Sequence, residues 1–271
     1  MKRAYADIPE GQMHYRIEGR GEPLLLLHAA VGSSDEYTKA IPFLSKYYCA
    51  IAIDYLGHGE SDKPPYPYRI LDHARTAVSF MDSLGIKKAS VVGKSAGANV
   101  AAELAINWPE RVNKLVLSSV GYFPDASEGI DMSNHPDFTS FTSQVDIKPD
   151  GSHLLEWWRR AALWGGTPDI VEERVIEYIK AGPRGEEIHW ASRDYDLKLR
   201  FPLINCPTLV LSGTRDAFYL VAEIVKKLIP ISKLTVIENG SIYVSRIMPK
   251  EFAEAILSFL NTPKSLIGKQ Y

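Results

Sequence analysis

Short apolar runs alternate along this 271-residue chain with segments of helical periodicity. The runs lie at residues 23–27, 49–53, 89–92, 114–117, 207–211 and 233–237. The amphipathic segments between and after them lie at residues 35–46, 70–84, 96–108 and 220–228, with a last helix that begins at Pro249. This alternation is typical of parallel strands joined by helical crossovers. The sequence therefore predicts an α/β fold, a mostly parallel sheet flanked by helices.

One segment interrupts the alternation. Residues 122–199 are rich in Pro, Gly, Ser and Asp and carry only helical pieces, at residues 152–163 and 169–180. We therefore expect a core made of residues 1–121 and 200–271, with an inserted helical cap at 122–199. At the start of the 35–46 segment, Ser33 and Glu36 have the spacing of a helix capping box.

Composition and charge exclude several function classes. The formal net charge is −2 and the pI is about 6.4, so no basic surface for nucleic acid or an anionic membrane is expected. Cys49 and Cys206 stand in apolar stretches and are expected to be buried thiols rather than a disulfide or zinc ligands. No metal or nucleotide motif occurs, so no cofactor is expected. Asp7 interrupts the N-terminal segment before an apolar signal region can develop, and this together with the lack of a long apolar run predicts a soluble, cytoplasmic protein.

A G-x-S-x-G motif carries the strongest chemical signal. Gly93, Ser95 and Gly97 directly follow a predicted strand and open a helix of small residues. A serine on so sharp a turn is presented at the carboxyl end of the sheet, and glycines on both sides avoid collisions with the neighbouring strand and helix. The N-terminus of the helix offers N–H groups to a developing oxyanion. The motif therefore predicts that Ser95 is a nucleophile.

Two further loops complete the pattern. Residues 28–34, His-Ala-Ala-Val-Gly-Ser-Ser, follow one apolar run, and residues 54–62, Asp-Tyr-Leu-Gly-His-Gly-Glu-Ser-Asp, follow the next. With the serine motif, and in this order, they resemble the α/β-hydrolase family, in the branch with H-G-x-x-x-S and D-x-x-G-x-G-x-S turns. Ala29 departs from the usual glycine, and Lys94 from the small, aromatic or histidine residue more common there. His28 and His58 are expected to be structural.

The resemblance implies an α/β-hydrolase fold with an eight-stranded sheet and a serine, acid, histidine order of catalytic residues. Asp216, in the turn after the 207–211 run, matches the acid. The backbone N–H groups of Ala30 and Ala96 match the oxyanion hole. All seven histidines precede Asp216, so the position of the family's histidine holds Ser241 or Ile242, depending on whether it is counted from Gly240 or from Pro249.

The absence of the histidine leaves several interpretations open. Neither Ser241 nor Ile242 can act as a base at neutral pH, and loss of the histidine from a serine triad lowers turnover by about 10⁶ in subtilisin. One of the cap histidines, His135, His153 or His189, could supply the base instead. Lys94 could do so as a Ser-Lys pair. The remaining interpretations are a binding protein that has lost turnover, a substitution introduced into this chain, or a reaction that needs only Ser95 and the oxyanion hole.

The expected cap is rich in aromatic side chains. Four of the five tryptophans and three phenylalanines fall in it: Trp157, Trp158, Trp164, Trp190, Phe123, Phe138 and Phe141. They predict a pocket over Ser95 for a small hydrophobic acyl or aromatic ligand, although the same residues could simply join cap to core. Three arginines, Arg159, Arg160 and Arg193, could pair with a ligand carboxylate. By resemblance we expect a serine hydrolase of carboxylic esters or related acyl compounds with impaired or atypical catalysis, and as the alternative a non-catalytic small-molecule-binding protein.

Overall fold

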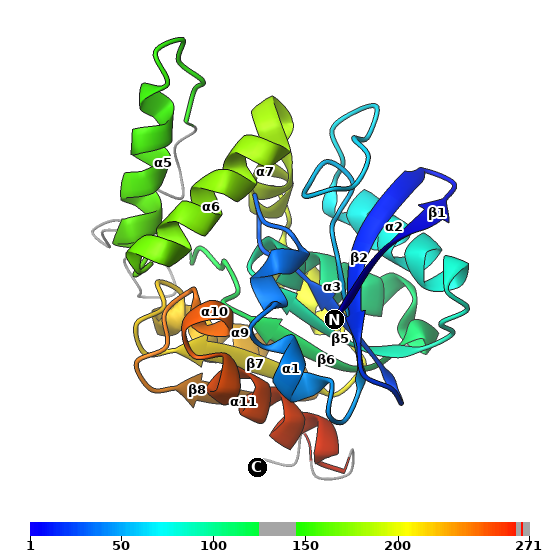
Figure 1. Ribbon diagram of the computed structural model, residues 1–271. Helices are drawn as coiled ribbons and strands as arrows, with labels where there is room; N and C mark the ends of the chain where they lie inside the picture. Colours follow the sequence, from blue (N-terminus) through cyan, green and yellow to red (C-terminus); the bar gives the residue numbers. More distant parts are fainter. Residues whose placement is uncertain (125–144, 264–266, 268–271) are drawn as a thin grey trace.

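The computed structural model describes residues 1–124, 145–263 and 267, and its centre is an eight-stranded sheet (Figure 1). The strands are β1 (Lys2–Ile8), β2 (Gly11–Glu18), β3 (Pro23–Leu27), β4 (Cys49–Ile53), β5 (Ala89–Lys94), β6 (Val112–Ser118), β7 (Thr208–Gly213) and β8 (Ser232–Ile237). Their order is β1-β2-β4-β3-β5-β6-β7-β8, and all neighbours from β4 to β8 are parallel. The predicted α/β-hydrolase fold with a mostly parallel eight-stranded sheet is confirmed.

The first two strands were not identified from the sequence. β1 and β2 form an antiparallel hairpin in which Ile8 pairs with Gly11, and β2 pairs antiparallel with β4. The hairpin is the edge of the sheet, and four of the seven β1 residues are exposed. Its strands therefore mix charged and apolar residues and lack the continuous apolar run of a strand buried on both faces.

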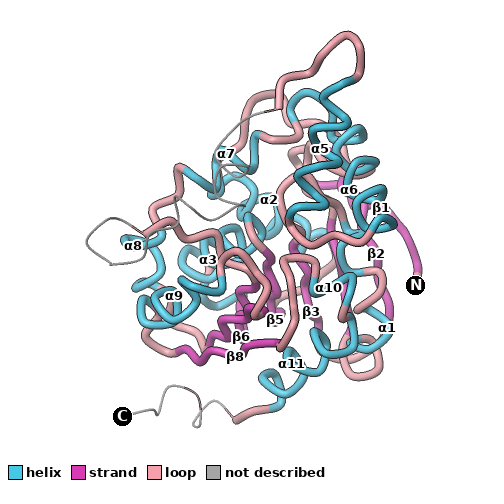
Figure 2. Tube along the Cα trace, turned by 90° about the vertical axis from the view of Figure 1, so that its left-hand side faces the viewer, coloured by secondary structure: helices cyan, strands magenta, loops and turns pink. Residues whose placement is uncertain are grey.

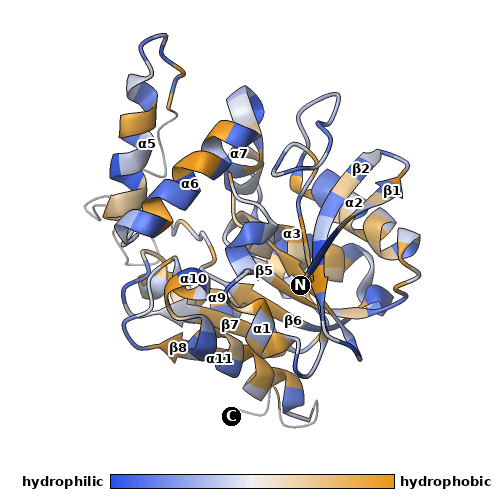
Figure 3. Cartoon of the chain, viewed as in Figure 1, coloured by the Kyte–Doolittle hydropathy of each residue, from blue (hydrophilic) through white to orange (hydrophobic). Residues whose placement is uncertain are grey.

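Helices cover both faces of the sheet. Leu25 and Leu27 of β3 face one core cluster, with α2 (Ile70–Ser83), α3 (Ala96–Asn107) and α9 (Ala222–Leu228). Leu24 and Leu26 face the other, with α1 (Ile41–Leu44) and α11 (Pro249–Asn261). Figure 3 shows the apolar strands between these layers. Burial of alternate residues on opposite faces explains why the central strands are apolar throughout.

The helix expected over residues 35–46 is divided. A 3₁₀ helix, η1 (Ser34–Tyr37), precedes the short helix α1, and Pro42 stands near the start of α1. Proline cannot donate the backbone hydrogen bond that a continuous helix needs at that point. The Ser33 hydroxyl caps η1 by accepting the Asp35 N–H, but the side chain of Glu36 is buried against β5 instead of completing a capping box. The capping-box prediction was therefore wrong for Glu36.

Between β6 and β7 the described chain forms helices and no strand. Three of them, α5 (Ser152–Leu163), α6 (Pro168–Ala181) and α7 (Glu187–Arg193), lie to one side of the sheet and are called the cap helices below (Figures 1 and 2). The same segment also holds the shorter elements η4 (Gly182–Arg184), α8 (Leu197–Arg200) and η5 (Phe201–Leu203). Elsewhere in the chain, η2 (Pro109–Arg111) precedes β6, η6 (Tyr219–Val221) follows β7 and α10 (Val244–Ile247) follows β8. The cap boundaries at residues 122 and 199 stay a prediction.

Two further features of the structure concern the cysteines and the length and polarity of the helices. Both cysteines are free thiols, and Cys206 is buried as expected, whereas Cys49 at the start of β4 is only partly buried. Among the described helices, none is both long enough and apolar enough to cross a membrane.

Candidate active site

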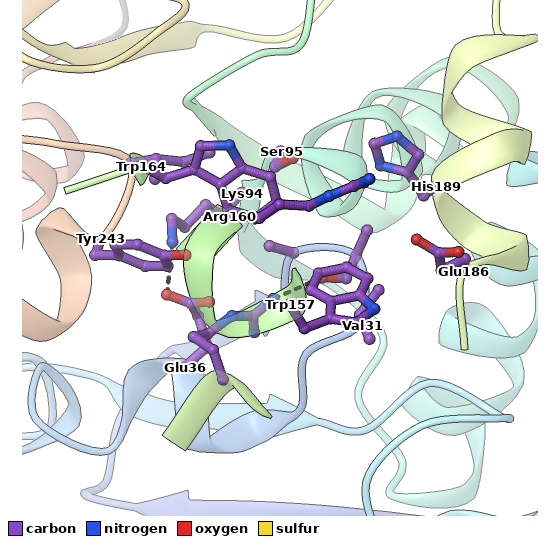
Figure 4. A pocket seen from close by; sticks show the side chains of 14 residues that line it. Val31, Glu36, Lys94, Ser95, Trp157, Arg160, Trp164, Glu186, His189 and Tyr243 are labelled. Carbon is purple, nitrogen blue, oxygen red and sulfur yellow. Dashed lines mark hydrogen bonds and ion pairs between the residues drawn. The ribbon is translucent and has the colours of Figure 1, made fainter. Parts of the chain in front are cut away.

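A pocket lies where the loops after β3, β5 and β8 meet the cap helices (Figure 4). Its empty volume is about 570 Å³, part of it open to solvent. The lining consists of Ala29, Ala30, Val31, Glu36, Lys94, Ser95, Trp157, Arg160, Trp164, Arg174, Glu186, His189, Ile242 and Tyr243. Residues from six separate segments therefore surround the Ser95 side chain, at the carboxyl end of the parallel strands, where ligands bind in open α/β sheets.

The backbone at Ser95 has the sharp turn that the motif predicts. Ser95 has φ 52° and ψ −120°, a conformation that L-residues rarely adopt, and it precedes the first residue of α3 without using its hydroxyl as a cap. A Cβ at position 93 would lie 2.1 Å from the carbonyl oxygen of Gly97, and one at position 97 would lie 2.3 Å from that of Leu27. Only glycine fits at either position, so the hydroxyl of Ser95 is held in the pocket by a rigid turn.

The loop after β3 is held by hydrogen bonds to its carbonyl groups. The His28 Nδ1–H donates to the Ala29 carbonyl at 2.7 Å, and His28 Nε2 accepts the Tyr55 N–H at 3.2 Å. Arg174 Nη2 of α6 donates to the Ala30 carbonyl at 2.9 Å. In a trans peptide the N–H points away from the C=O, so these bonds also fix the directions of the Ala30 and Val31 N–H groups. His28 is thus structural, as expected.

The residues matched to the acid and histidine positions lie on the loops after β7 and β8, which contact each other through the Arg215 N–H and the Gly240 carbonyl at 2.9 Å. Asp216 is buried after β7, where its Oδ1 accepts the Phe218 N–H at 3.0 Å, and it is not part of the pocket lining. The Ser241 hydroxyl accepts the Tyr243 N–H at 3.2 Å and also lies outside the lining. Ile242 and Tyr243 line the pocket instead. The loop after β8 therefore presents an aliphatic side chain and a phenol to the pocket.

Lys94, the residue before Ser95, belongs to a buried ion pair. Its Nζ lies 2.7 Å from Glu36 Oε1, and both side chains are 1% exposed. The Lys94 and Arg246 charges hold the pKa of Glu36 at about 2, against the opposing effect of burial. The Lys94 ammonium also lies 5.6 Å from the centre of the Tyr243 ring. Burial lowers the pKa of Lys94, and the ionised Glu36 opposes this shift by stabilising the ammonium form.

The same carboxylate starts a network that ties the cap to the core. Glu36 also accepts the Ser245 hydroxyl and lies 3.7 Å from Arg246 Nε. Arg246 of α10 donates to both carboxylate oxygens of Glu177 on α6, at 2.7 and 2.9 Å. Glu177 in turn accepts the Ser33 hydroxyl at 2.9 Å and Arg174 Nη1 at 2.5 Å. Elements from four parts of the chain therefore share one buried set of charges, with Arg174 ending at the Ala30 carbonyl.

The cap histidines are placed differently from one another. His135 lies outside the described residues. His153 of α5 accepts the Lys148 N–H at 3.2 Å through Nδ1, and its ring lies 6.4 Å from that of Tyr178, outside the pocket lining. His189 of α7 lines the pocket together with Ser95. Figure 4 shows His189 and Glu186 along the edge of the pocket formed by α7.

Two of the four cap tryptophans line the pocket. Trp157 is buried and packs edge-to-face against Trp164 at 6.3 Å between ring centres. Trp158 is 39% exposed and outside the lining, because successive residues of a helix point to different sides. Trp190 is also outside it, and its ring contacts His189 at 5.3 Å.

The remaining cap residues of interest have varied positions. Phe123 packs against Phe218 at 5.7 Å, and Phe138 and Phe141 lie outside the described residues. Arg160 lines the pocket, with its Nε 3.1 Å from Glu156 Oε1. Of the other two arginines, Arg159 is exposed and Arg193 stacks on the ring of Trp190 at 5.1 Å.

Sequence reasoning missed most of the charged residues of this region. They are Glu36, Arg174, Glu177, Glu186 and Arg246. One signal was available: Glu186 and His189 have the i, i+3 spacing of side chains on one helix face. Arg174 and Glu177 have the same spacing on α6, but the other partners of the buried network are far apart in the sequence and left no local signal. Among the described residues, no group of three potential metal ligands occurs.

Comparisons with known proteins agree with this architecture. A family model described as alpha/beta hydrolase fold matches residues 22–161. The 2-hydroxy-6-oxo-6-phenylhexa-2,4-dienoate hydrolase of Comamonas testosteroni is 34% identical over 231 residues, which cover 78% of this chain and 77% of that protein. Haloalkane dehalogenase 2 of Mycobacterium tuberculosis is 34% identical over 119 residues, which cover 44% of this chain and 42% of that protein.

Several curated relatives match only in part, and the chain spans 31% to 42% of their length. Among solved structures, a meta-cleavage product hydrolase from Pseudomonas fluorescens superposes with a TM-score of 0.76 at 21% identity, covering 95% of this chain and 97% of that one. A likeness at this level of identity shows the fold.

Proposed function

The chain belongs to the α/β-hydrolase fold family, and from that membership and the pocket geometry we propose that it is a serine-dependent hydrolase of a carboxylic ester or a related acyl compound. Ser95 is the nucleophile in this proposal. The observation that carries it is the positive φ of Ser95. The hydroxyl of this residue makes no helix-capping hydrogen bond and lines a pocket together with the loop that contains Ala30.

The pocket supports a substrate with a small hydrophobic or aromatic acyl group. Trp157, Trp164 and Ile242 provide apolar surface, and the N–H groups of Ala30 and of Ala96, at the start of α3, are the proposed oxyanion donors. The first N–H groups of a helix have no partner inside the helix, so Ala96 can donate to a developing negative charge. The hydrolase names of relatives such as the Comamonas testosteroni protein are consistent with acyl chemistry of this kind.

A panel of p-nitrophenyl esters, from acetate to benzoate, tests the proposal. We expect hydrolysis by the native protein and its loss in Ser95→Ala, whereas Ser152→Ala, at the exposed start of α5, keeps the native rate. Both variants must show the native circular dichroism spectrum. A folded native protein with no turnover, or turnover that Ser95→Ala retains, contradicts the proposal.

The second candidate is a non-catalytic small-molecule-binding protein. Ile242 favours it, because an aliphatic side chain lines the pocket near the position at which the family resemblance expects a histidine. For a pure binding protein, the Ile242→His variant is the informative one. Esterase activity that appears only in this variant would indicate that the native pocket binds without turning over its ligand.

A further inference from the structure

We infer that His189, from the cap helix α7, is the general base for Ser95, with Glu186 as the residue that positions its ring. This inference rests on the proposed function, since it concerns the proton of the same serine. It replaces the base that the loop after β8 would provide in the family resemblance with one from a different part of the chain. Triads are defined by geometry and not by the order of their residues in the sequence.

The charged and titratable residues of the pocket leave few choices for a base. Lys94 donates to Glu36 Oε1 at 2.7 Å in a buried ion pair, so its amino group is engaged by that carboxylate, and a pKa of about 2 makes Glu36 a weak base. Tyr243 is protonated at neutral pH, because burial raises its pKa. Of the histidines in the described part of the chain, His189 alone lines the pocket with Ser95.

The helix that carries His189 is fixed to the helix that begins after Ser95. Asn99 of α3 donates through Nδ2 to the Ser192 hydroxyl of α7 at 2.6 Å and to the Ser192 carbonyl at 3.3 Å. Asn99 lies about one helical turn beyond Ser95, and His189 about one turn before Ser192. The Asn99 contact therefore fixes the position of α7 relative to α3, and His189 lines the same pocket as Ser95.

Glu186 stands one turn before His189. The His189 N–H donates to the Glu186 carbonyl at 2.9 Å, which closes the first turn of α7, and both side chains line the pocket (Figure 4). Side chains three apart on a helix are neighbours, about 5–6 Å between Cβ atoms. A carboxylate at this distance favours the imidazolium that forms when histidine accepts a proton.

The reaction then balances with residues that the chain supplies. His189 takes the proton of the Ser95 hydroxyl while Ser95 Oγ bonds to the acyl carbon, and the carbonyl π electrons move to its oxygen. The carbon–oxygen bond to the alcohol breaks as the imidazolium returns the proton to the leaving alkoxide. Water repeats the attack on the acyl-enzyme with His189 again as base, and Ser95 is restored with release of the carboxylic acid.

The test is the second-order rate of labelling by a fluorophosphonate, followed by intact mass in native protein, His189→Ala and His189→Gln. We expect both variants to react at least about 100-fold more slowly, the loss typical of a missing general base. The matched control is His153→Ala, a second cap histidine outside the pocket, and it keeps the native rate. His189→Gln guards against a folding defect in the alanine variant.

The pH profile separates a base from a structural residue. In native protein the labelling rate rises with pH through one ionisation, and His189→Gln loses that rise. Glu186→Gln shifts the midpoint to lower pH, because it removes a negative charge that favours the imidazolium. The charged groups that face the pocket from the other elements are Arg160 of α5, Arg174 of α6, Glu36 of η1 and Lys94 of β5, and all stay unchanged in these variants.

The two failures are distinguishable. Labelling that depends on Ser95 but is as fast in both His189 variants as in native protein overturns the role of His189 and leaves the proposed function standing. A folded native protein that is not labelled overturns both.

Discussion

The buried pair of Glu36 and Lys94 makes the sharpest stability prediction. Glu36→Gln leaves the Lys94 ammonium and the Arg246 guanidinium beside an amide, and both cations are buried. The pKa of Glu36 lies at about 2 instead of 4.5, which corresponds to about 3 kcal/mol in favour of the charged form. Removal of one partner from a buried pair typically costs about 3–5 kcal/mol. We therefore expect a loss of about 3 kcal/mol in the free energy of unfolding.

Urea unfolding at pH 7 measures this loss, and two further variants define its cause. Glu60→Gln breaks an ion pair of similar length, 2.6 Å to Lys180, but the two side chains are 50% and 46% exposed, so its cost stays below about 1 kcal/mol. The double variant Glu36→Gln/Lys94→Met removes one of the two cations, while Arg246 keeps its ion pair with Glu177, and it recovers much of the loss. The reasoning is refuted if Glu36→Gln costs no more than Glu60→Gln, or if the double variant is no more stable than the single one.

The same pair has a defined pH dependence. Because the folded-state pKa of Glu36 is depressed, its stabilising effect is complete above the unfolded value of 4.5 and is lost as the pH falls toward 2. The difference in unfolding free energy between native protein and Glu36→Gln should therefore narrow across that range. A difference that stays constant down to pH 3 would contradict the assigned pKa.

Three other predictions follow from single contacts. Burial lowers the pKa of His58 to about 4, so on acidification the unfolded chain binds a proton at His58 at a higher pH than the folded chain does. Urea titrations should therefore show that His58 lowers the free energy of unfolding by about 2 kcal/mol between pH 7 and pH 5, and His58→Asn should remove this loss. Gly97→Ala places a methyl group 2.3 Å from the Leu27 carbonyl and should lower the urea midpoint strongly or prevent folding. Arg174→Met releases the Ala30 carbonyl and should slow fluorophosphonate labelling by about tenfold or more.

Each of these has a matched control that should have a much smaller effect on the measured quantity. His153→Asn replaces a partly exposed histidine, Gly85→Ala adds a methyl group with no atom within 4 Å, and Arg159→Met changes an exposed arginine of α5. Gly85 has φ 68°, so its variant is expected to lose only about 1–2 kcal/mol. Equal effects in a variant and its control would contradict the corresponding contact.

The central fold was predictable because its signals are local. The strands β3 to β7 are buried on both faces, which produces apolar runs that stand out between helical segments, and the edge strand β8 is half-buried but keeps a mostly apolar run. The glycines at 93 and 97 permit close backbone approaches, and together with the strand before them and the helix after them they predicted the turn at Ser95. The hairpin β1–β2 escaped prediction because an edge position permits charged residues on its exposed face.

The charged half of the site was not predictable from local pattern. Glu36 and Lys94 are 58 residues apart in the chain, and Arg246 reaches Glu177 across 69 residues. Glu36 looked like a capping residue because its spacing from Ser33 fits that role, and only the packing of η1 against β5 brings it to a buried lysine. Which cap histidine meets Ser95 likewise depends on how α7 docks on α3, a contact made by Asn99 and Ser192.

The measurement that tests the account most directly is the mass of the protein after reaction with a fluorophosphonate, followed by peptide mapping. The account predicts one adduct per chain, located on Ser95, absent from Ser95→Ala and formed far more slowly in His189→Ala. A folded native protein that gains no adduct, or an adduct that forms equally well in Ser95→Ala, would contradict it.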